Sequence, residues 1–193
     1  MPLSSPISRR ALKHPRAIHL EAFARDDGLR DIDAHITDIN ADDATPASGV
    51  RSVGLPMYDL WLRLTIDTQL SVVDAEAASD AVPYYGHCDT MAPDYKKLSG
   101  LNLIKGFRAG LKAKLTGIQG CTHLTELAQV LPTASIQAFA GEVLDTRAGA
   151  GTDAQTHKPF QRDRCHTPRS DDATVAKYYP RWAVNASAKV LAG

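Results

Sequence analysis

The chain has 193 residues, of which 44% are hydrophobic, and its 22 lysines and arginines balance its 22 aspartates and glutamates to a net charge of zero. A globule of this length buries about two-thirds to 70% of its unfolded surface, so we expect one domain with an extended tail. The charge balance argues against a dedicated nucleic-acid-binding protein, which normally carries a basic excess.

Targeting signals and cysteine usage restrict the expected compartment. No apolar run approaches the ~18–20 residues that cross a bilayer. The N-terminal stretch MPLSSPISRRALKHPR has basic residues with no apolar core after them, which does not fit a secretory signal. Three cysteines, an odd number, fit reduced thiols better than a disulfide framework. The sequence therefore predicts a cytoplasmic protein without a membrane contact.

The first part of the chain predicts an arm followed by a β-hairpin. Residues 1–18 are rich in proline and basic residues, which is typical of an extended arm. In residues 20–39 the turn is supplied by Asp26, Asp27 and Gly28. After the turn, apolar and polar residues alternate between two faces: Ile32, Ala34 and Ile36 against Asp31, Asp33, His35 and Thr37. A polar loop follows over about 40–56.

Residues 58–67 give the clearest strand pattern. Tyr58, Leu60, Leu62, Leu64 and Ile66 fall on one face by strict alternation. Residues 70–79 predict its antiparallel partner, with imperfect alternation at Val72 and Val73 that indicates a bulge or a weak edge.

The hydrophobic period then changes to that of helices. Pro93 and Asp94 predict the start of a first helix, which Gly100 interrupts. Phe107, Leu111 and Leu115 predict a second helix that Gly117 stops, and a third helix begins at Thr122, with Pro132 kinking or ending it.

Hairpins followed by helices, without alternation of the two along the chain, predict an α+β fold. We expect an antiparallel sheet built from two hairpins, helices packed on one face, and an extended C-terminal tail. Residues 1–18 would form the arm and residues 19–140 the α+β core. Residues 141–193 would form a mobile loop and a tail that packs on the core.

Each of the three cysteines has a histidine beside it: His87–Cys88, Cys121–Thr122–His123 and Cys165–His166. Thiolate and imidazole groups bind zinc or iron where three or four of them converge. The chain has no CxxC and no HExxH spacing, so a metal site would have to assemble from distant segments. The alternative interpretation is a small buried Cys88 with partly exposed histidines.

Cys121 is the strongest single candidate for chemistry. It precedes a predicted helix, where unpaired backbone N–H groups and the helix dipole stabilise a thiolate. His123 can share the site only if Cys121 lies before the first regular turn, because inside a helix their side chains would diverge by about 200°. The alternative is that Thr122 caps the helix and Cys121 fills a crevice.

Two further polar groups are candidates. The polar strand faces carry Asp31, Asp33, His35 and Asp59, and a carboxylate–histidine pair among them could perform acid–base chemistry. The alternative is an ordinary solvated sheet face, which needs the same polar pattern. In the tail, Arg164 and His166 belong to a polar set that suits an anion. The chain has no GxSxG, P-loop or GxGxxG motif, which argues against the usual nucleotide-dependent enzymes.

Several stretches resemble one bacterial family: RDDGLRDIDAHITD (25–38), YDLWLRLTID (58–67), GCTHLTEL (120–127), KPFQRDRCHTPRSD (158–171) and YYPRW (178–182). Over nearly its whole length the chain resembles the family catalogued as domain of unknown function 2889 (DUF2889). That name records no activity. The resemblance implies a stand-alone cytoplasmic protein associated with the catabolism of aromatic or acyl compounds.

A fainter likeness of topology is to the iron–sulfur scaffold family, in which three cysteines and one aspartate converge. This resemblance places Asp59 at the aspartate, Cys88 at the second cysteine and Cys121 at the third. Met57 stands where that family has its first cysteine, which departs from the pattern.

The favoured hypothesis is a small-molecule enzyme of lyase or hydrolase type that needs no nucleotide or other cofactor and acts on an aromatic or acyl compound. Cys121 and His123 would be the nucleophile or acid–base pair, and Asp59 would orient them. Arg164 and His166 would close the site from the tail.

The rival hypothesis is a metal or sulfur carrier that holds zinc or iron through Asp59, Cys88 and Cys121. A third is a partner-binding module that docks another chain through the aromatic residues of the tail. A homo-oligomer is compatible with each of them.

Overall fold

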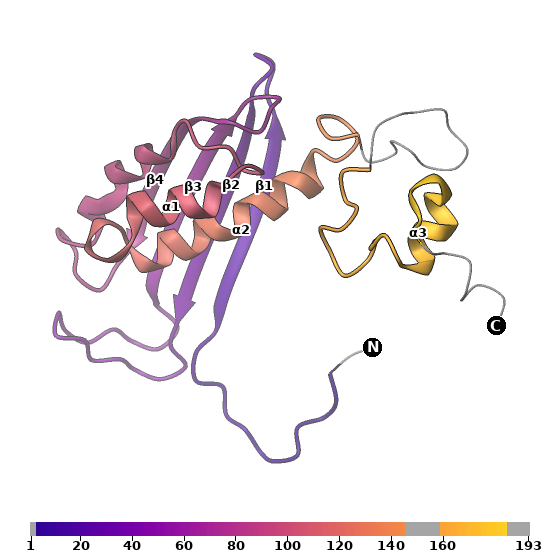
Figure 1. Ribbon diagram of the computed structural model, residues 1–193. Coiled ribbons are helices and arrows are strands. Elements are labelled where there is room, and N and C mark those ends of the chain that lie inside the picture. Colours follow the sequence, from indigo (N-terminus) through magenta and orange to yellow (C-terminus); the bar gives the residue numbers. More distant parts are fainter. Residues whose placement is uncertain (1–2, 146–158, 185–193) are drawn as a thin grey trace. The chain divides into compact units, whose positions relative to one another are not determined.

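The computed structural model describes residues 3–145 and 159–184 (Figure 1). The chain divides into two compact units, residues 1–135 and 136–193, and each is described by itself. The predicted packing of the tail on the core concerns the relation between these units and stays a prediction. Most of the loop predicted to be mobile, residues 146–158, lies outside the described residues.

One antiparallel sheet forms the first unit. Its four strands follow one another in the order β1-β2-β3-β4, and each pairs with the next. The strands are β1 (Arg16–Ala24), β2 (Arg30–Ile39), β3 (Pro56–Ile66) and β4 (Val72–Ala81). The predicted α+β fold with two hairpins is confirmed. β1 begins at Arg16, so the last residues of the predicted arm already belong to the sheet.

Short local contacts close both hairpins. Between β1 and β2, Gly28 adopts a φ of +83°, which a residue without a Cβ tolerates. The Asp27 carboxylate accepts the Leu29 N–H at 3.1 Å in the same turn. Between β3 and β4, Asp67 Oδ1 accepts the N–H groups of Gln69 and Ser71, both at 2.8 Å. Aspartate suits such turns because its side chain satisfies backbone donors nearby.

The bulge predicted at Val72 and Val73 is confirmed. The register of β3 with β4 pairs Thr65 with Asp74 but Ile66 with Val72, so one residue of β4 is left over. A bulge of this kind twists the strand locally.

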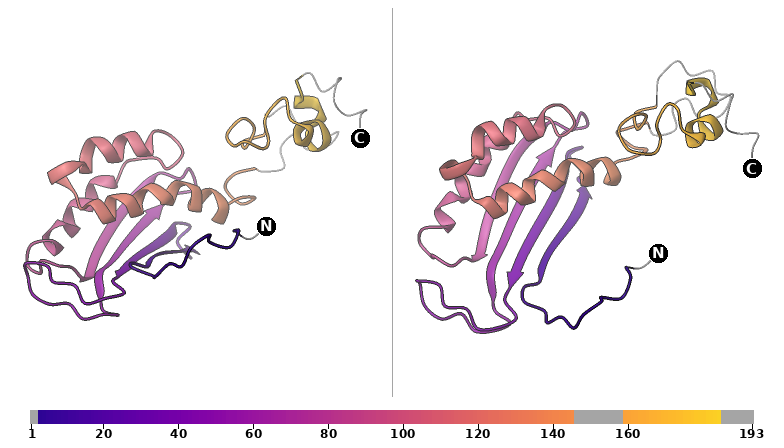
Figure 2. Two further views of the ribbon diagram at one scale, coloured as in Figure 1. Left: turned by 90° about the horizontal axis from the view of Figure 1, so that it is seen from below. Right: turned by 60° about the horizontal axis from the view of Figure 1, so that its bottom comes forward.

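The helices lie on one face of the sheet (Figure 2). They are the 3₁₀ helix η1 (Asp89–Leu98), α1 (Phe107–Leu115), the short 3₁₀ turn η2 (Gly117–Gln119) and α2 (Thr122–Ala138). α1 contains the predicted Phe107, Leu111 and Leu115 and ends two residues before Gly117. η1 begins before the predicted start, with Pro93 inside it, because a run of short 3₁₀ turns tolerates the loss of one N–H donor. α2 continues through Pro132.

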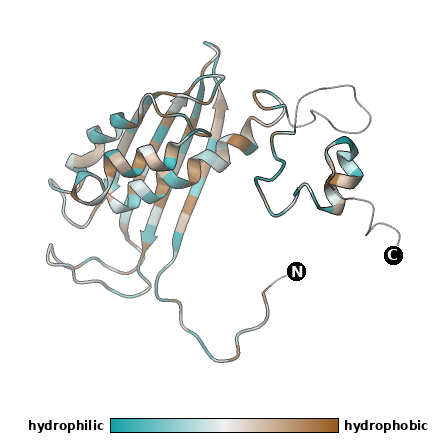
Figure 3. Cartoon of the chain, viewed as in Figure 1, coloured by the Kyte–Doolittle hydropathy of each residue, from teal (hydrophilic) through white to brown (hydrophobic). Residues whose placement is uncertain are grey.

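The core lies between the sheet and these helices. Strand alternation sends one set of apolar side chains toward the helices, and Figure 3 shows the resulting alternation of hydrophobic and hydrophilic residues along the strands. The fully buried strand residues are Ile32, Ala34, Ile36, Leu60, Leu62, Leu64 and Ile66. They meet Tyr95, Leu98, Phe107, Leu111, Leu115, Leu124, Leu127 and Leu131 from the helices.

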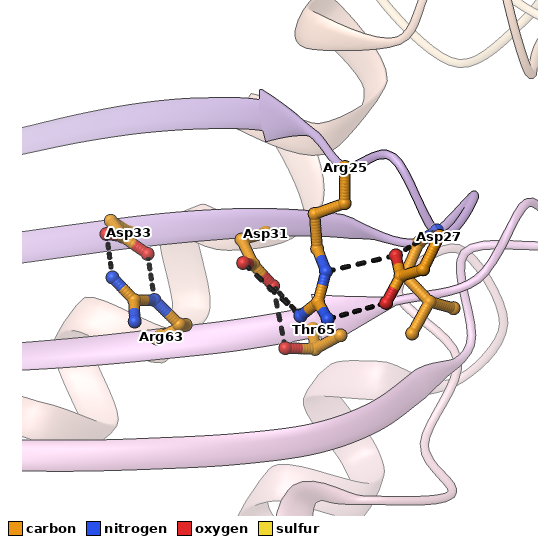
Figure 4. A network of polar contacts seen from close by, with 7 residues as sticks. Arg25, Asp27, Asp31, Asp33, Arg63 and Thr65 are labelled. Carbon is orange, nitrogen blue, oxygen red and sulfur yellow. Dashed lines mark hydrogen bonds and ion pairs between the residues drawn. The ribbon is translucent and has the colours of Figure 1, made fainter.

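The opposite face of the sheet, called the open face below, is polar. Among residues 3–135 no helix lies over it (Figure 2). Its side chains pair across the strands: Arg63 donates to both carboxylate oxygens of Asp33 at 2.6 Å, and Thr65 donates to Asp31 at 2.7 Å (Figure 4). The open face is therefore stabilised by cross-strand pairs rather than by apolar packing.

Within residues 159–184, the second unit contains one short helix, α3 (Ala173–Tyr178), and a 3₁₀ turn, η3 (Pro180–Trp182). Asp172 caps α3 by accepting the Thr174 N–H at 2.8 Å. The carboxylate of Asp163 accepts the Ser170 N–H at 2.8 Å, which closes the loop before the helix.

Candidate functional site

A buried carboxylate stands at the end of β2. Asp38 follows Ile32, Ala34 and Ile36 on the face that the helices cover, and only 1% of its side chain is exposed. Arg16 donates to both of its oxygens, from Nε at 2.7 Å and from Nη2 at 2.9 Å. An aspartate on a buried face needs such partners, since an unpaired buried charge is very costly.

His14, from the N-terminal arm, adds a further contact. Its Nε2 lies 2.8 Å from Asp38 Oδ1, and its Nδ1 lies 3.2 Å from Asn40 Oδ1. Burial by itself would raise the pKa of Asp38, but the hydrogen bonds from Arg16 and His14 outweigh it and hold that pKa below its usual value. Asp38 therefore stays ionised at neutral pH.

His123 reaches the same carboxylate from the second position of α2. Its Nε2 lies 3.5 Å from Asp38 Oδ2, and its ring stacks on Tyr58 of β3, with ring centres 3.7 Å apart. Burial lowers the pKa of His123, and the nearby Asp38 charge offsets only part of that effect. The imidazole is therefore neutral near pH 7 and able to accept a proton.

A second ion pair ties α2 to the sheet. Arg16 Nη1 donates to Glu126 at 2.6 Å, one turn along the helix from His123. Arg16 thus links β1, β2 and α2, and fixes the start of the helix over Asp38. We call His14, Arg16, Asp38, Tyr58 and His123 the Asp38 cluster.

Cys121 immediately precedes α2. Its carbonyl accepts the first helical hydrogen bond, from the Thr125 N–H at 2.9 Å, so the condition that allows Cys121 and His123 to share a site is met. The hydroxyl of Tyr95, a fully buried residue, donates to the Cys121 carbonyl at 2.8 Å and accepts the Cys121 N–H at 3.2 Å. Tyr95 thereby fixes the backbone that carries the thiol.

The two thiols of the first unit lie near Tyr58. Burial raises the pKa of the Tyr58 hydroxyl, and electrostatic interaction with Cys88 and Cys121 raises it further. Both cysteines are half-buried and free. Within residues 3–145 no hydrogen bond joins the Cys121 thiol to His123, and Tyr58 interacts with both residues, by stacking on His123 and electrostatically with Cys121.

Asp59, predicted to orient Cys121 and His123, lies on the open face instead. Its Oδ1 is 2.5 Å from His35 Nε2, and the His35 ring stacks on Trp61 with ring centres 3.7 Å apart. The physical reason is strand alternation: Leu60 faces the helices, so its neighbour Asp59 must face away from them. The carboxylate that lies beside His123 is that of Asp38.

Arg164 and His166 belong to the second unit. The guanidinium of Arg164 lies 4.4 Å from the centre of the Phe160 ring, and His166 is exposed. Closure of the site by these residues depends on how the two units sit and stays a prediction.

The residues that the carrier hypothesis names as metal ligands do not all lie on the same side of the sheet. Asp59 projects to the open face, whereas Cys121 begins the helix that covers the other face. Across residues 3–145 and 159–184, no three or more histidine, cysteine or carboxylate side chains are grouped so that they could hold a metal ion.

The sequence-based prediction did not include Asp38, the buried carboxylate at the centre of the cluster. The signal was present, because the alternation of Ile32, Ala34 and Ile36 extends to Asp38 and puts a charge on the apolar face. Tyr58 could be found in the same way, at the polar end of the apolar face of β3. Arg16 and His14 carry no such signal, since their partner lies in another strand.

The fold and this cluster define an α+β protein with a one-sided antiparallel sheet and a polar group buried where the sheet meets α2. Residues 14–137 match the family described as Protein of unknown function (DUF2889), and the chain belongs to that family. The match contains the whole Asp38 cluster and ends in α2, close to the boundary between the two units. The motifs at 158–171 and 178–182 lie outside it.

No curated protein and no solved structure matches the chain. The likeness to iron–sulfur scaffolds therefore gains no support from known proteins. Among the described residues, no helix has both the length and the apolar composition needed to cross a membrane.

Proposed function

We propose that this protein is an enzyme that uses the Asp38 cluster for acid–base chemistry on a small acyl or aromatic compound, without a nucleotide cofactor. One observation carries the proposal: a buried carboxylate that is ionised at neutral pH stands 3.5 Å from a histidine whose pKa is lowered by burial. Pairs of titratable groups with pKa values pushed apart by their surroundings are typical of catalytic sites.

The roles follow from the contacts. His123 accepts a proton, and Asp38 stabilises the imidazolium that forms. Arg16 and His14 keep Asp38 ionised, because Arg16 donates to both carboxylate oxygens and His14 donates to Oδ1. Tyr58 holds the plane of the imidazole by stacking. Such a carboxylate–histidine arrangement suits general base catalysis.

Cys121 is the nucleophile of the proposed reaction. Its thiol passes a proton to His123 through the substrate or a water molecule, and the thiolate attacks the acyl carbon. The leaving group departs with the proton from His123, and a thioester remains on Cys121. Water then hydrolyses the thioester, with His123 again as the base, and restores the free thiol.

The test is the hydrolysis of 4-nitrophenyl esters and acyl thioesters by the wild type and three variants. His123→Ala and Cys121→Ser are each expected to reduce the rate by about 10²–10⁴-fold. His19→Ala, a substitution of an exposed histidine on the open face, is the matched control and should leave the rate unchanged. Equal rates for His123→Ala and His19→Ala would remove the proposal.

Titration of the His123 ring by NMR gives a second readout that needs no substrate. The pKa should lie below the usual 6.5, and Asp38→Asn should lower it further, because the carboxylate favours the protonated ring. An unchanged pKa in Asp38→Asn would show that the carboxylate does not act on His123.

A further inference from the structure

The open face contains a shallow cavity beside Trp61. Its volume is about 210 Å³, and its lining residues are Asp33, Trp61, Leu62, Arg63, Glu76, Ala77 and Ala78. It lies on the opposite side of the sheet from the Asp38 cluster, so it is separate from the proposed catalytic site.

The cavity exists because the two neighbours of Trp61 differ in size. On β2 the residue opposite Trp61 is His35, whose ring is parallel to the indole within 4° and covers one of its faces. On β4 the residue opposite is Ala78, which reaches no further than a methyl group. The second indole face is therefore left uncovered above Ala78.

The charges around this indole face favour a cation. Arg63 is bound by both oxygens of Asp33, so its charge is already compensated. Within the described chain, the Glu76 carboxylate makes no hydrogen bond or ion pair and interacts with Arg63 only at longer range. The indole N–H donates to Asp80 at 2.9 Å, which adds a further negative charge at the ring edge.

We propose that this cavity binds a flat organic cation, an amidinium or guanidinium group. The cation lies on the free face of Trp61, where the ring's negative π-surface attracts it. Its N–H groups point to Glu76, and a planar fork of donors matches a carboxylate better than a compact ammonium does. Anions are disfavoured, because Glu76 and Asp80 both repel them.

The test uses benzamidinium and its neutral isostere benzamide, which differ in charge but hardly in shape. Trp182→Phe leaves Trp61 as the sole tryptophan, because the chain has two. The indole N–H resonance of Trp61 then reports binding directly. We expect a saturable shift with benzamidinium at a dissociation constant of about 1 mM, and binding of benzamide at least about tenfold weaker.

Two variants in the Trp182→Phe background locate the site. Ala78→Leu should abolish the shift by filling the cavity, and Glu76→Gln should weaken binding about tenfold by removing the carboxylate charge. Asp74→Asn is the matched control, since it removes a charge from the same strand and face without lining the cavity, and it should change the dissociation constant less than twofold. Circular dichroism checks that each variant is folded.

Three outcomes would overturn the proposal: benzamide binding as tightly as benzamidinium, binding unaffected by Ala78→Leu, or no saturable shift with benzamidinium. Methylguanidinium and an acetylated, amidated Gly-Arg-Gly peptide then distinguish the sources of the cation. Tighter binding of the peptide indicates an arginine side chain of another protein, and tighter binding of methylguanidinium indicates a free guanidino compound.

Discussion

Asp38 Oδ2 lies 3.5 Å from His123 Nε2, which brings the end of β2 to the first turn of α2. The contact crosses the layer between sheet and helix at a place where apolar packing would otherwise be expected. It is held by Arg16, which binds Asp38 in the sheet and Glu126 on the helix. The geometry of the proposed catalytic site and the stability of the first unit therefore depend on the same few charges.

Replacement of Asp38 by asparagine should lower the free energy of unfolding by about 2–3 kcal/mol, because Arg16 and His14 lose charge-assisted hydrogen bonds at a buried acceptor. Urea denaturation measures the change. Asp42→Asn is the control, since its pair with Lys13 is exposed and such pairs contribute at most about 1 kcal/mol. Equal losses in the two variants would show that Asp38 has no special role.

The free energy of unfolding should decrease in two stages as the pH is lowered. The pKa of His123 in the folded state lies below 6.5, so as the pH falls below about 6.5 the unfolded chain binds that proton first and the free energy of unfolding decreases. The pKa of Asp38 is lowered from 3.8, so its contribution is present above 3.8 and is lost as the pH falls through its folded value.

The two stages can be separated by denaturation at a series of pH values. His123→Gln should remove the first stage and keep the second. A wild-type stability that stays constant from pH 7 to pH 5 would contradict the burial of His123 as a neutral ring.

Tyr95→Phe should destabilise the protein by about 1–3 kcal/mol, because the Cys121 N–H and carbonyl both lose the buried hydroxyl. Hydrogen exchange of the first amides of α2 should accelerate as well. Tyr85→Phe, at an exposed tyrosine, is the control and should be neutral. Unchanged exchange in Tyr95→Phe would mean that Tyr95 does not fix the start of α2.

Gly120→Ala tests how closely the backbone just before Cys121 packs against Leu115, the last residue of α1. A Cβ at Gly120 would stand 2.3 Å from the Leu115 carbonyl oxygen, a backbone atom that cannot move aside cheaply. We expect a loss of about 1–3 kcal/mol. At Gly110 the added Cβ would meet Leu101 Cδ2 at 2.5 Å, the end of a flexible side chain. Gly110→Ala should therefore be the milder substitution in thermal denaturation.

The sequence was most informative where the signal is local. The turn at Gly28, the strict alternation of β3 and the helical pattern of α1 follow from residues within a few positions of one another, and all were predicted. η1 was misplaced because Pro93 was taken as the start of an α-helix, whereas the segment forms 3₁₀ turns before and after it.

In the candidate site, by contrast, the contacts join residues that are far apart in the sequence, and the local pattern predicted only part of them. Cys121 and His123 were found because their positions at the start of a helix are visible in the sequence. Asp59 was predicted on the polar face of β3, where it lies, but that face is turned away from the helices and from His123, so the orienting role predicted for it does not fit. Asp38 carried the same kind of signal, a carboxylate in register with Ile36, and was overlooked.

The sequence by itself determined the two hairpins, the positions of α1 and α2, the apolar face of the sheet and the family. Only the tertiary structure decided which polar groups meet, because the five residues of the Asp38 cluster come from four separate segments of the chain: His14 and Arg16 from one, and Asp38, Tyr58 and His123 from one each. Periodicity states which face a side chain occupies, but long-range register and the placement of α2 decide its neighbours. An ion pair across such distances leaves no mark in the local pattern, since its free energy arises only when both partners are buried together.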